Sequence, residues 1–171
     1  IKFQSSMAKV GTIADATAVP LNALQKDIVN LSNEIGVNAN NIAEDVYNAI
    51  SAGQKTEDAV GFVGQAVKLA KGGFAETGQA LDVMTTILNA YGKESSEAEA
   101  VADMLIQTQN KGKVTVAELS SVMGKIIPTA NANNVALEQL CAGYAIMTAR
   151  GIAAAETTTY MNSMLNELGK T

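Results

Sequence analysis

The sequence predicts an all-α protein of stacked antiparallel αα-hairpins. Apolar residues recur at spacings of three and four, which is the period of one buried helix face. A Gly or Asn interrupts this pattern about every 15 residues, and a Ser, Thr or Asn then restarts it. No stretch has the length and alternation typical of a strand. Short links between such helices make consecutive helices antiparallel neighbours.

The first clear helix follows an ambiguous start. Residues 1–18 fit either a helix or an arm docked on the rest, so we expect an N-terminal arm or helix over 1–18 and an all-helical domain over 19–171. A helix over about 21–35 begins after Pro20, since proline is tolerated at a first helical position. Gly36 is its stop. Its apolar stripe consists of Leu21, Leu24, Ile28, Leu31 and Ile35.

Three further helices follow at short intervals. The second helix runs from about residue 37 to Gly53, and the third begins at Thr56 and ends near the Gly72–Gly73 pair. The fourth covers about 75–91, and Gly92 ends it. Each carries one apolar stripe, so each is expected to bury one face against its neighbours.

Two capping boxes predict the next helix starts. In a capping box the cap hydroxyl accepts a backbone N–H, and a Glu three residues later accepts the N–H of the cap residue. Ser96 with Glu99 predicts a helix to about residue 109, and Thr115 with Glu118 predicts one to about Ile127. The segment 130–134, ANANN, is expected to be a loop after Pro128. Helices over about 136–150 and 154–168 complete a set of about eight.

Two stretches of 14 residues resemble each other, QALDVMTTILNAYG at 79–92 and EQLCAGYAIMTARG at 138–151. Both end in Gly and share Leu, Ile and Ala at equivalent positions. We interpret them as a pseudo-repeat, since two similar hairpins can bury their faces on each other.

Composition excludes several functional classes. The net charge of −5 and the scattered basic residues argue against a nucleic-acid surface, which needs clustered Lys and Arg. There is no His, so the usual general base and the commonest metal ligand are missing. No run of apolar residues is long enough to span a bilayer. We therefore expect no enzyme activity, no cofactor, and no catalytic, cofactor-binding or metal site.

Several residues in the sequence carry groups that can take part in catalysis or binding. Cys141 on a predicted helix fits a buried core residue better than a reactive thiol. The terminal GKT lacks the upstream Gly and strand of a phosphate-binding loop. Two carboxylate pairs, Glu44–Asp45 and Glu57–Asp58, are expected in first helical turns as helix-dipole partners. The Thr157–Thr159 run either packs through hydroxyl hydrogen bonds or is solvated, and the solvated reading is favoured.

Six methionines fall at core-like helical positions. They fit core filler better than a Met-rich partner groove. The residues concerned are Met84, Met104, Met123, Met147, Met161 and Met164.

The order of several phrases resembles a known family. FQSSMAKVGTIAD near the start is followed by LNAYG, VADML, MTARGI and AAAETTTYMNSML. This order, over nearly the whole chain, is similar to the core segment of the tail tape measure proteins of long-tailed phages, prophages and phage-tail-like particles. NNVAL stands where family members tend to have GVS. The start at Ile1 fits a fragment of a longer protein.

The resemblance implies a structural role in a phage tail. Such a parent lies in the lumen of the tail tube, sets the tail length, and leaves the tail ahead of the DNA. Its implied partners are the tail tube protein, tail assembly chaperones and tail tip or baseplate proteins, with self-association possible and no direct nucleic-acid binding. During assembly it would be in the bacterial host cytoplasm. The alternative is an all-helical interaction module of a large bacterial protein.

Frequent helix breaks qualify the idea of a ruler. A ruler works as an extended rod, at about 1.5 Å per residue if helical. A segment broken about every 15 residues is instead expected to fold as a compact module when free.

Overall fold

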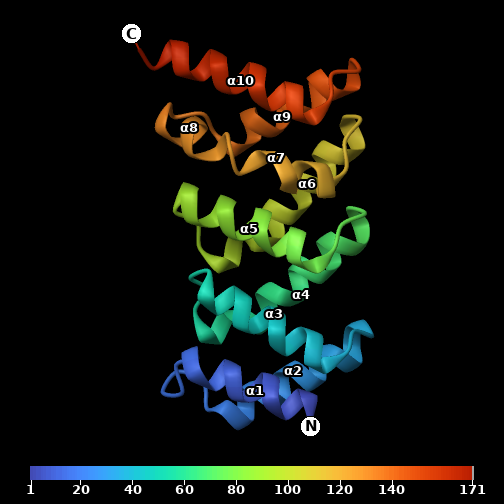
Figure 1. The fold of residues 1–171 in the computed structure, drawn as a ribbon, viewed down its shortest axis with the longest axis vertical. Coiled ribbons are helices and arrows are strands. Elements are labelled where there is room, and N and C mark those ends of the chain that lie inside the picture. Colours follow the sequence, from blue (N-terminus) through green and yellow to red (C-terminus); the bar gives the residue numbers. More distant parts are fainter. Residues whose placement is uncertain (171) are drawn as a thin grey trace. The chain divides into compact units, whose positions relative to one another are not determined.

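The computed structural model describes residues 1–170 and confirms the all-α class, with no strand among these residues (Figure 1). It contains ten α-helices and one 3₁₀ turn. Their bounds are α1 (Lys2–Ile13), α2 (Leu21–Ile35), α3 (Ala39–Ser51), α4 (Thr56–Gly72), α5 (Thr77–Tyr91), η1 (Ser95–Glu97), α6 (Ala98–Lys111), α7 (Val116–Met123), α8 (Ile127–Ala132), α9 (Leu137–Ala149) and α10 (Ala154–Leu168). No helix in this described part is both long and apolar enough to cross a membrane.

The structure has two more α-helices than the eight or so predicted, and two segments of the chain account for them. The ambiguous start is a helix, α1. The helix expected to reach Ile127 ends at Met123 as α7, and a separate short helix, α8, begins at Ile127. Pro128 lies in the first turn of α8, where it sacrifices no helical hydrogen bond. The predicted loop at 130–134 is therefore partly wrong, because its first three residues are helical.

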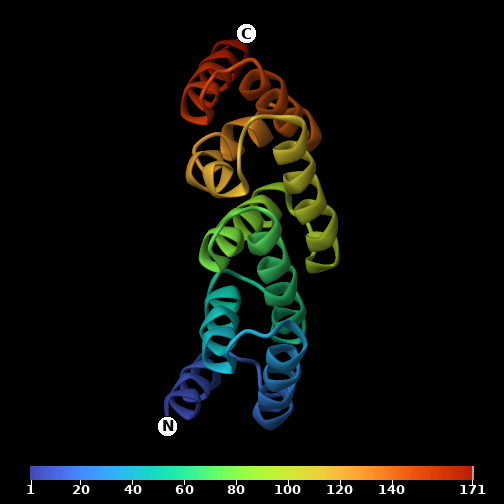
Figure 2. The same ribbon diagram turned by 90° about the vertical axis from the view of Figure 1, so that its right-hand side faces the viewer.

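The chain divides into two compact units, Ile1–Val67 and the part from Lys68 onward. This division does not coincide with the boundary expected at residue 18, because α1 packs on α3 within the first unit (Figure 1, Figure 2). The buried side chains of α1 at this contact are Ser6, Met7 and Val10.

Hydrogen bonds connect α1 and the residues just after it to other parts of the first unit. The Ser6 hydroxyl donates to Asn40 Oδ1 at 2.7 Å, and the backbone N–H of Asp15 donates to Thr56 Oγ1 at 2.9 Å. The predicted stripe of α2 is confirmed in part: Leu24 and Ile28 are fully buried, Leu31 and Ile35 are half-buried, and Leu21 is exposed. Of the two alternatives for residues 1–18, the structure has a helix, and its buried face contributes to the core of this unit.

The second unit is built around α5 and α9. Helix α5 packs against α6, α7 and α8, while α9 packs against α6 and α10. Tyr144 of α9 is fully buried, and its hydroxyl lies 2.5 Å from Thr158 Oγ1 of α10. Burial raises the pKa of Tyr144 to about 12, so this hydroxyl stays neutral at physiological pH.

Four helical segments of the second unit begin with the same arrangement. A Glu or Gln side chain accepts the backbone N–H of the residue three positions earlier, which satisfies one orphan donor of the helix start. The pairs are Glu76–Gln79, Glu94–Glu97, Thr115–Glu118 and Ala136–Gln139, with N···O distances of 2.8–3.0 Å. Thr115–Glu118 confirms one predicted box. The other, Ser96–Glu99, is wrong, because the chain turns two residues earlier into η1.

Five helices end in a common motif. A residue with positive φ follows each helix, and the next N–H donates back to the carbonyl five residues earlier, as in a Schellman motif. The left-handed residues are Gly53, Phe74, Gly92, Asn134 and Gly151. Gly92 and Gly151, the ends of the pseudo-repeat, are confirmed as helix stops. Phe74 is exceptional, because a Cβ disfavours this conformation and its ring is 78% exposed.

Candidate interaction surfaces

The single thiol is structural. Cys141 is buried on α9, and burial raises the pKa of its thiol. A thiol that stays protonated is a poor nucleophile, so the prediction of a core residue is confirmed. The terminal GKT includes Thr171, which lies outside the described residues.

The two carboxylate pairs differ. Glu57 and Asp58 lie in the first turn of α4, as predicted. Glu44 and Asp45 do not lie in the first turn of α3, because that helix already begins at Ala39. Desolvation raises the pKa of Asp45 from 3.8 to about 6, and the neighbouring Glu44 adds to the increase. Ionisation of Asp45 at neutral pH therefore lowers the stability of the folded state.

This cost predicts an unusual pH dependence. Because the folded pKa lies above the unfolded one, the folded state binds more protons between about pH 4 and 6, and stability falls as pH rises through this window. We expect Asp45→Asn to raise the free energy of unfolding by about 1 kcal/mol at neutral pH, after discounting for partial exposure, and by little near pH 4. Urea unfolding across this range measures both values.

The matched control is Asp27→Asn, which changes an exposed carboxylate of the same unit. It should stay within about 0.5 kcal/mol of the parent at each pH. An Asp45→Asn chain whose stability follows the parent's at every pH would contradict the assignment.

Not every methionine lies in the core. Met84, Met123 and Met161 are buried, whereas Met104 and Met147 are half-buried. Met164 is 55% exposed, so its assignment to the core is wrong. The residue lies on the exposed face of α10 with Tyr160, whereas the adjacent Leu165 is buried on the covered face.

The threonine run packs rather than facing solvent. Thr157 and Thr158 are buried, and only Thr159 is exposed, so the solvated reading is wrong for the first two. Thr158 Oγ1 donates to the Ala154 carbonyl at 2.8 Å in addition to its contact with Tyr144. Thr157 Oγ1 is buried without a hydrogen-bond partner among the described residues.

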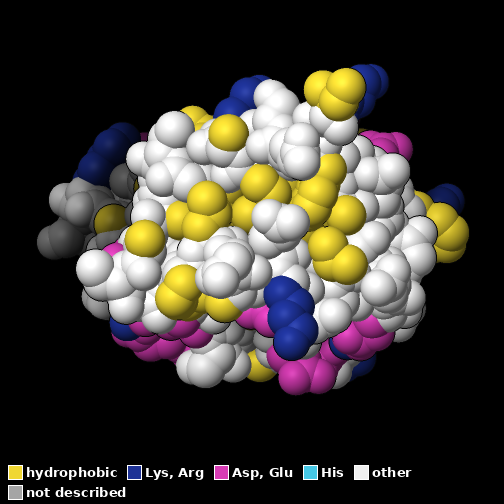
Figure 3. All heavy atoms as spheres, turned by 90° about the horizontal axis from the view of Figure 1, so that it is seen from below, with side chains coloured by type: hydrophobic (Ala, Val, Ile, Leu, Met, Phe, Trp, Pro, Cys, Tyr) yellow, Lys and Arg dark blue, Asp and Glu magenta, His cyan; other side chains and the backbone are white. Residues whose placement is uncertain are grey.

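Two surfaces expose large apolar side chains. On α10, Tyr160, Met164 and Leu168 recur every fourth residue and are each more than half exposed. In the first unit, Leu21 and Val29 of α2 are exposed, and apolar side chains form a band across the face seen in Figure 3. Surfaces of this kind are typical of contact with other polypeptide.

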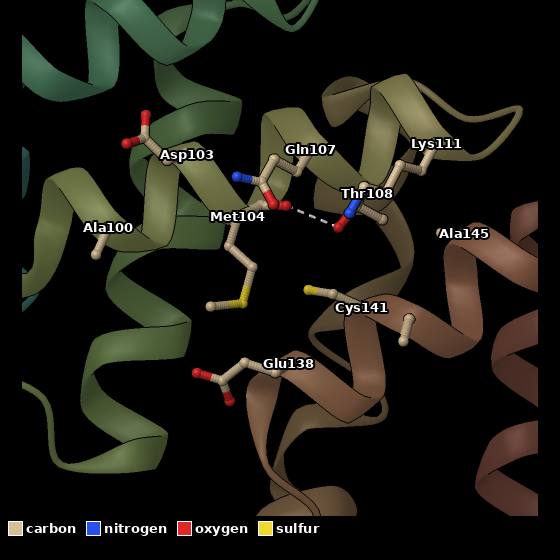
Figure 4. Close-up of a pocket in the computed structure, with 10 residues that line it drawn as sticks. Ala100, Asp103, Met104, Gln107, Thr108, Lys111, Glu138, Cys141 and Ala145 are labelled. Carbon is tan, nitrogen blue, oxygen red and sulfur yellow. Dashed lines mark hydrogen bonds between the residues drawn. The ribbon is translucent and has the colours of Figure 1, made fainter.

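A groove runs between α6 and α9, and we call it the α6–α9 groove (Figure 4). Its main part has a volume of about 450 Å³, and an apolar extension continues it to the end of α9. Small or sulfur-containing side chains, Thr108, Cys141 and Ala145, form the floor. Both parts share Lys111 and Ala142, so the groove is continuous.

The two ends of the α6–α9 groove differ in charge. Asp103 and Glu138 project from opposite walls at one end. Lys111 and Arg150 line the other end. All four side chains are exposed at the rim. No group of three or more potential metal-ligating side chains occurs in residues 1–170.

Sequence reasoning did not find the groove. Of the lining residues, the sequence pointed only to Cys141 and Met104, and both were predicted as core. The rim charges are isolated in the sequence. No signal in the sequence pairs Asp103 with Glu138, because their positions along one groove depend on the packing of two helices separated by α7 and α8.

Comparisons with known proteins point to one family. Residues 25–171 match the family described as phage-related minor tail protein. The chain is 40% identical over 174 residues to a "Probable tape measure protein" of Clostridium phage phiCD119, covering 99% of this chain and 18% of that protein. It is 24% identical over 169 residues to a "Tape measure protein" of Pneumococcus phage Dp-1, covering 99% of this chain and 15% of that protein. The chain thus spans less than a fifth of either relative. No solved structure matches it.

Proposed function

Because this chain belongs to the family of phage-related minor tail proteins, we propose that it is one folded segment of a tape measure protein that sets tail length. The observation that carries the proposal is the 40% identity to a probable tape measure protein along nearly the entire chain. A structural role in the tail also agrees with the all-α fold. The role of the segment is architectural rather than catalytic.

The proposal extends to location and partners. The parent protein would lie in the lumen of the tail tube, after assembly in the host cytoplasm, and leave ahead of the DNA. Tail tube, chaperone and tail tip or baseplate proteins are its proposed partners. The apolar surfaces on α2 and α10 are places where such contacts would bury apolar area.

The number of residues sets how much length this segment can contribute. As one continuous helix, 171 residues would span about 260 Å, at 1.5 Å per residue. The longest helix has only 17 residues, and each unit is compact, so a folded segment spans far less. The change of tail length per residue therefore reports whether the segment is folded or opened in the tube.

Deletion and duplication of residues 1–171 in the parent gene test the proposal. We expect tails that are shorter and longer than the parent's by equal amounts, each up to about 260 Å if the segment is opened into helix. Electron micrographs of negatively stained tails give the lengths. As a control, a helical domain of equal length and unrelated sequence in place of the segment should preserve tail length. Unchanged tails in both length variants would contradict a ruler role for this segment.

A further inference from the structure

The α6–α9 groove has a direction as well as a shape. Helix α6 ends beside the end of α9, because the backbone N–H of Lys113 donates to Thr148 Oγ1 at 3.0 Å. The position where a Gly112 Cβ would lie is 2.9 Å from the Ala145 Cα, so the two backbones nearly touch there. The two helices therefore run parallel, from the Asp103–Glu138 end to the Lys111–Arg150 end.

The floor of the groove suits another helix. Thr108, Cys141 and Ala145 are small, and the groove-lining residues of both helices recur every three or four positions. Small side chains let a third helix approach closely along this line. The lining of α6 extends from Ala100 to Lys111, about three turns, which gives a comparable length for the occupant.

We propose that the α6–α9 groove is a docking site for an amphipathic helix of a partner protein, laid parallel to α6 and α9, basic in its first half and acidic in its second. Asp103 and Glu138 face the basic half and the positive end of the helix dipole. Lys111 and Arg150 face the acidic half and the negative end. The inference is independent of the proposed ruler role, because it depends only on this groove.

Two peptides of identical composition test the direction. Each is about 16 residues long and fluorescently labelled, with an Ala and Leu face and a hydrocarbon cross-link on its polar face to equalise helicity. One carries Lys in its first half and Glu in its second, and the other reverses this order. In fluorescence anisotropy with the 171-residue chain, we expect the first to bind about tenfold more tightly at low salt, with the preference shrinking at high salt.

Variants of the chain locate the site. Swapping the four rim charges (Asp103→Lys, Glu138→Lys, Lys111→Glu and Arg150→Glu) should invert the preference. An equal swap at exposed charges outside the groove should preserve it, using Glu34→Lys, Asp82→Lys, Lys26→Glu and Lys125→Glu. Ala142→Trp, which fills the groove, should abolish binding of both peptides; circular dichroism checks that each variant is folded.

Three results would overturn the proposal. These are no binding of either peptide, equal binding of both, or a preference that the rim swap leaves unchanged. Sedimentation of the chain alone covers the remaining alternative. If it forms a dimer that Ala142→Trp dissociates, the occupant is a second copy of this chain and not a partner helix.

Discussion

Replacing Gly73 with alanine is expected to lower the free energy of unfolding by about 3 kcal/mol. A Cβ at this position would lie 2.4 Å from the Val116 Cβ and 2.8 Å from the Leu69 carbonyl oxygen. Neither atom belongs to the flexible end of a side chain, so the link after α4 and the start of α7 must separate. Val116 is fully buried, which makes this separation costly. Urea unfolding followed by far-UV circular dichroism measures the loss.

Gly78 provides the matched control for this substitution. It lies in the first turn of α5, with no atom within 4 Å of the position its Cβ would take. Gly78→Ala should leave stability unchanged or raise it by about 0.5 kcal/mol, since alanine favours helix. Combining Gly73→Ala with Val116→Gly should cost less than the sum of the two single changes, because the second removes the clash with Val116 and leaves only that with the Leu69 carbonyl oxygen. Strict additivity of this pair would refute the explanation.

Truncating Tyr144 to alanine should cost about 4 kcal/mol, the largest loss expected from one side chain here. Its ring is fully buried between α9 and α10, and its hydroxyl pairs with Thr158. Tyr144→Phe separates the two contributions: it removes only the hydrogen bond, and about 1 kcal/mol is expected. Thr158 keeps its bond to the Ala154 carbonyl in that variant.

Tyr160 is the internal comparison for Tyr144. It is the same residue type in the same unit but is 55% exposed on α10. Tyr160→Ala should change stability by less than about 0.5 kcal/mol. If both tyrosines cost the same when truncated, burial of Tyr144 does not stabilise the α9–α10 pair as described.

Helix periodicity and stop signals in the sequence predict most of the fold. The 3.6-residue stripes predicted α2 and α10 at nearly their observed bounds, and Gly36, Gly92 and Gly151 ended helices as expected. These signals are local, because a helix chooses its start and stop from a few adjacent residues. The Thr115–Glu118 box was readable for the same reason.

Features that depend on tertiary packing could not be predicted from the sequence. Pro128 suggested the end of a helix, whereas burial of Ile127 and Ala130 stabilises a new short helix around it. Phe74 occupies a position where glycine is expected, so nothing in its identity indicates the left-handed turn. The α6–α9 groove required two helices that are not consecutive in the chain. The burial of Thr157 and Thr158 likewise depends on which helices cover α10.

The recurring helix starts and stops have an evolutionary consequence. Helices α5 and α9 each carry their own capping pair and their own left-handed stop residue. A gene segment that encodes such a helix therefore also encodes its start and its end. Such a piece can be inserted or lost by recombination without rewriting the neighbouring residues, provided its apolar stripe finds a partner. Homologous chains should therefore differ in length by whole helix-and-link increments of about 20 residues, concentrated at the links. Under the ruler role proposed above, each such increment would change the tail length by a fixed step.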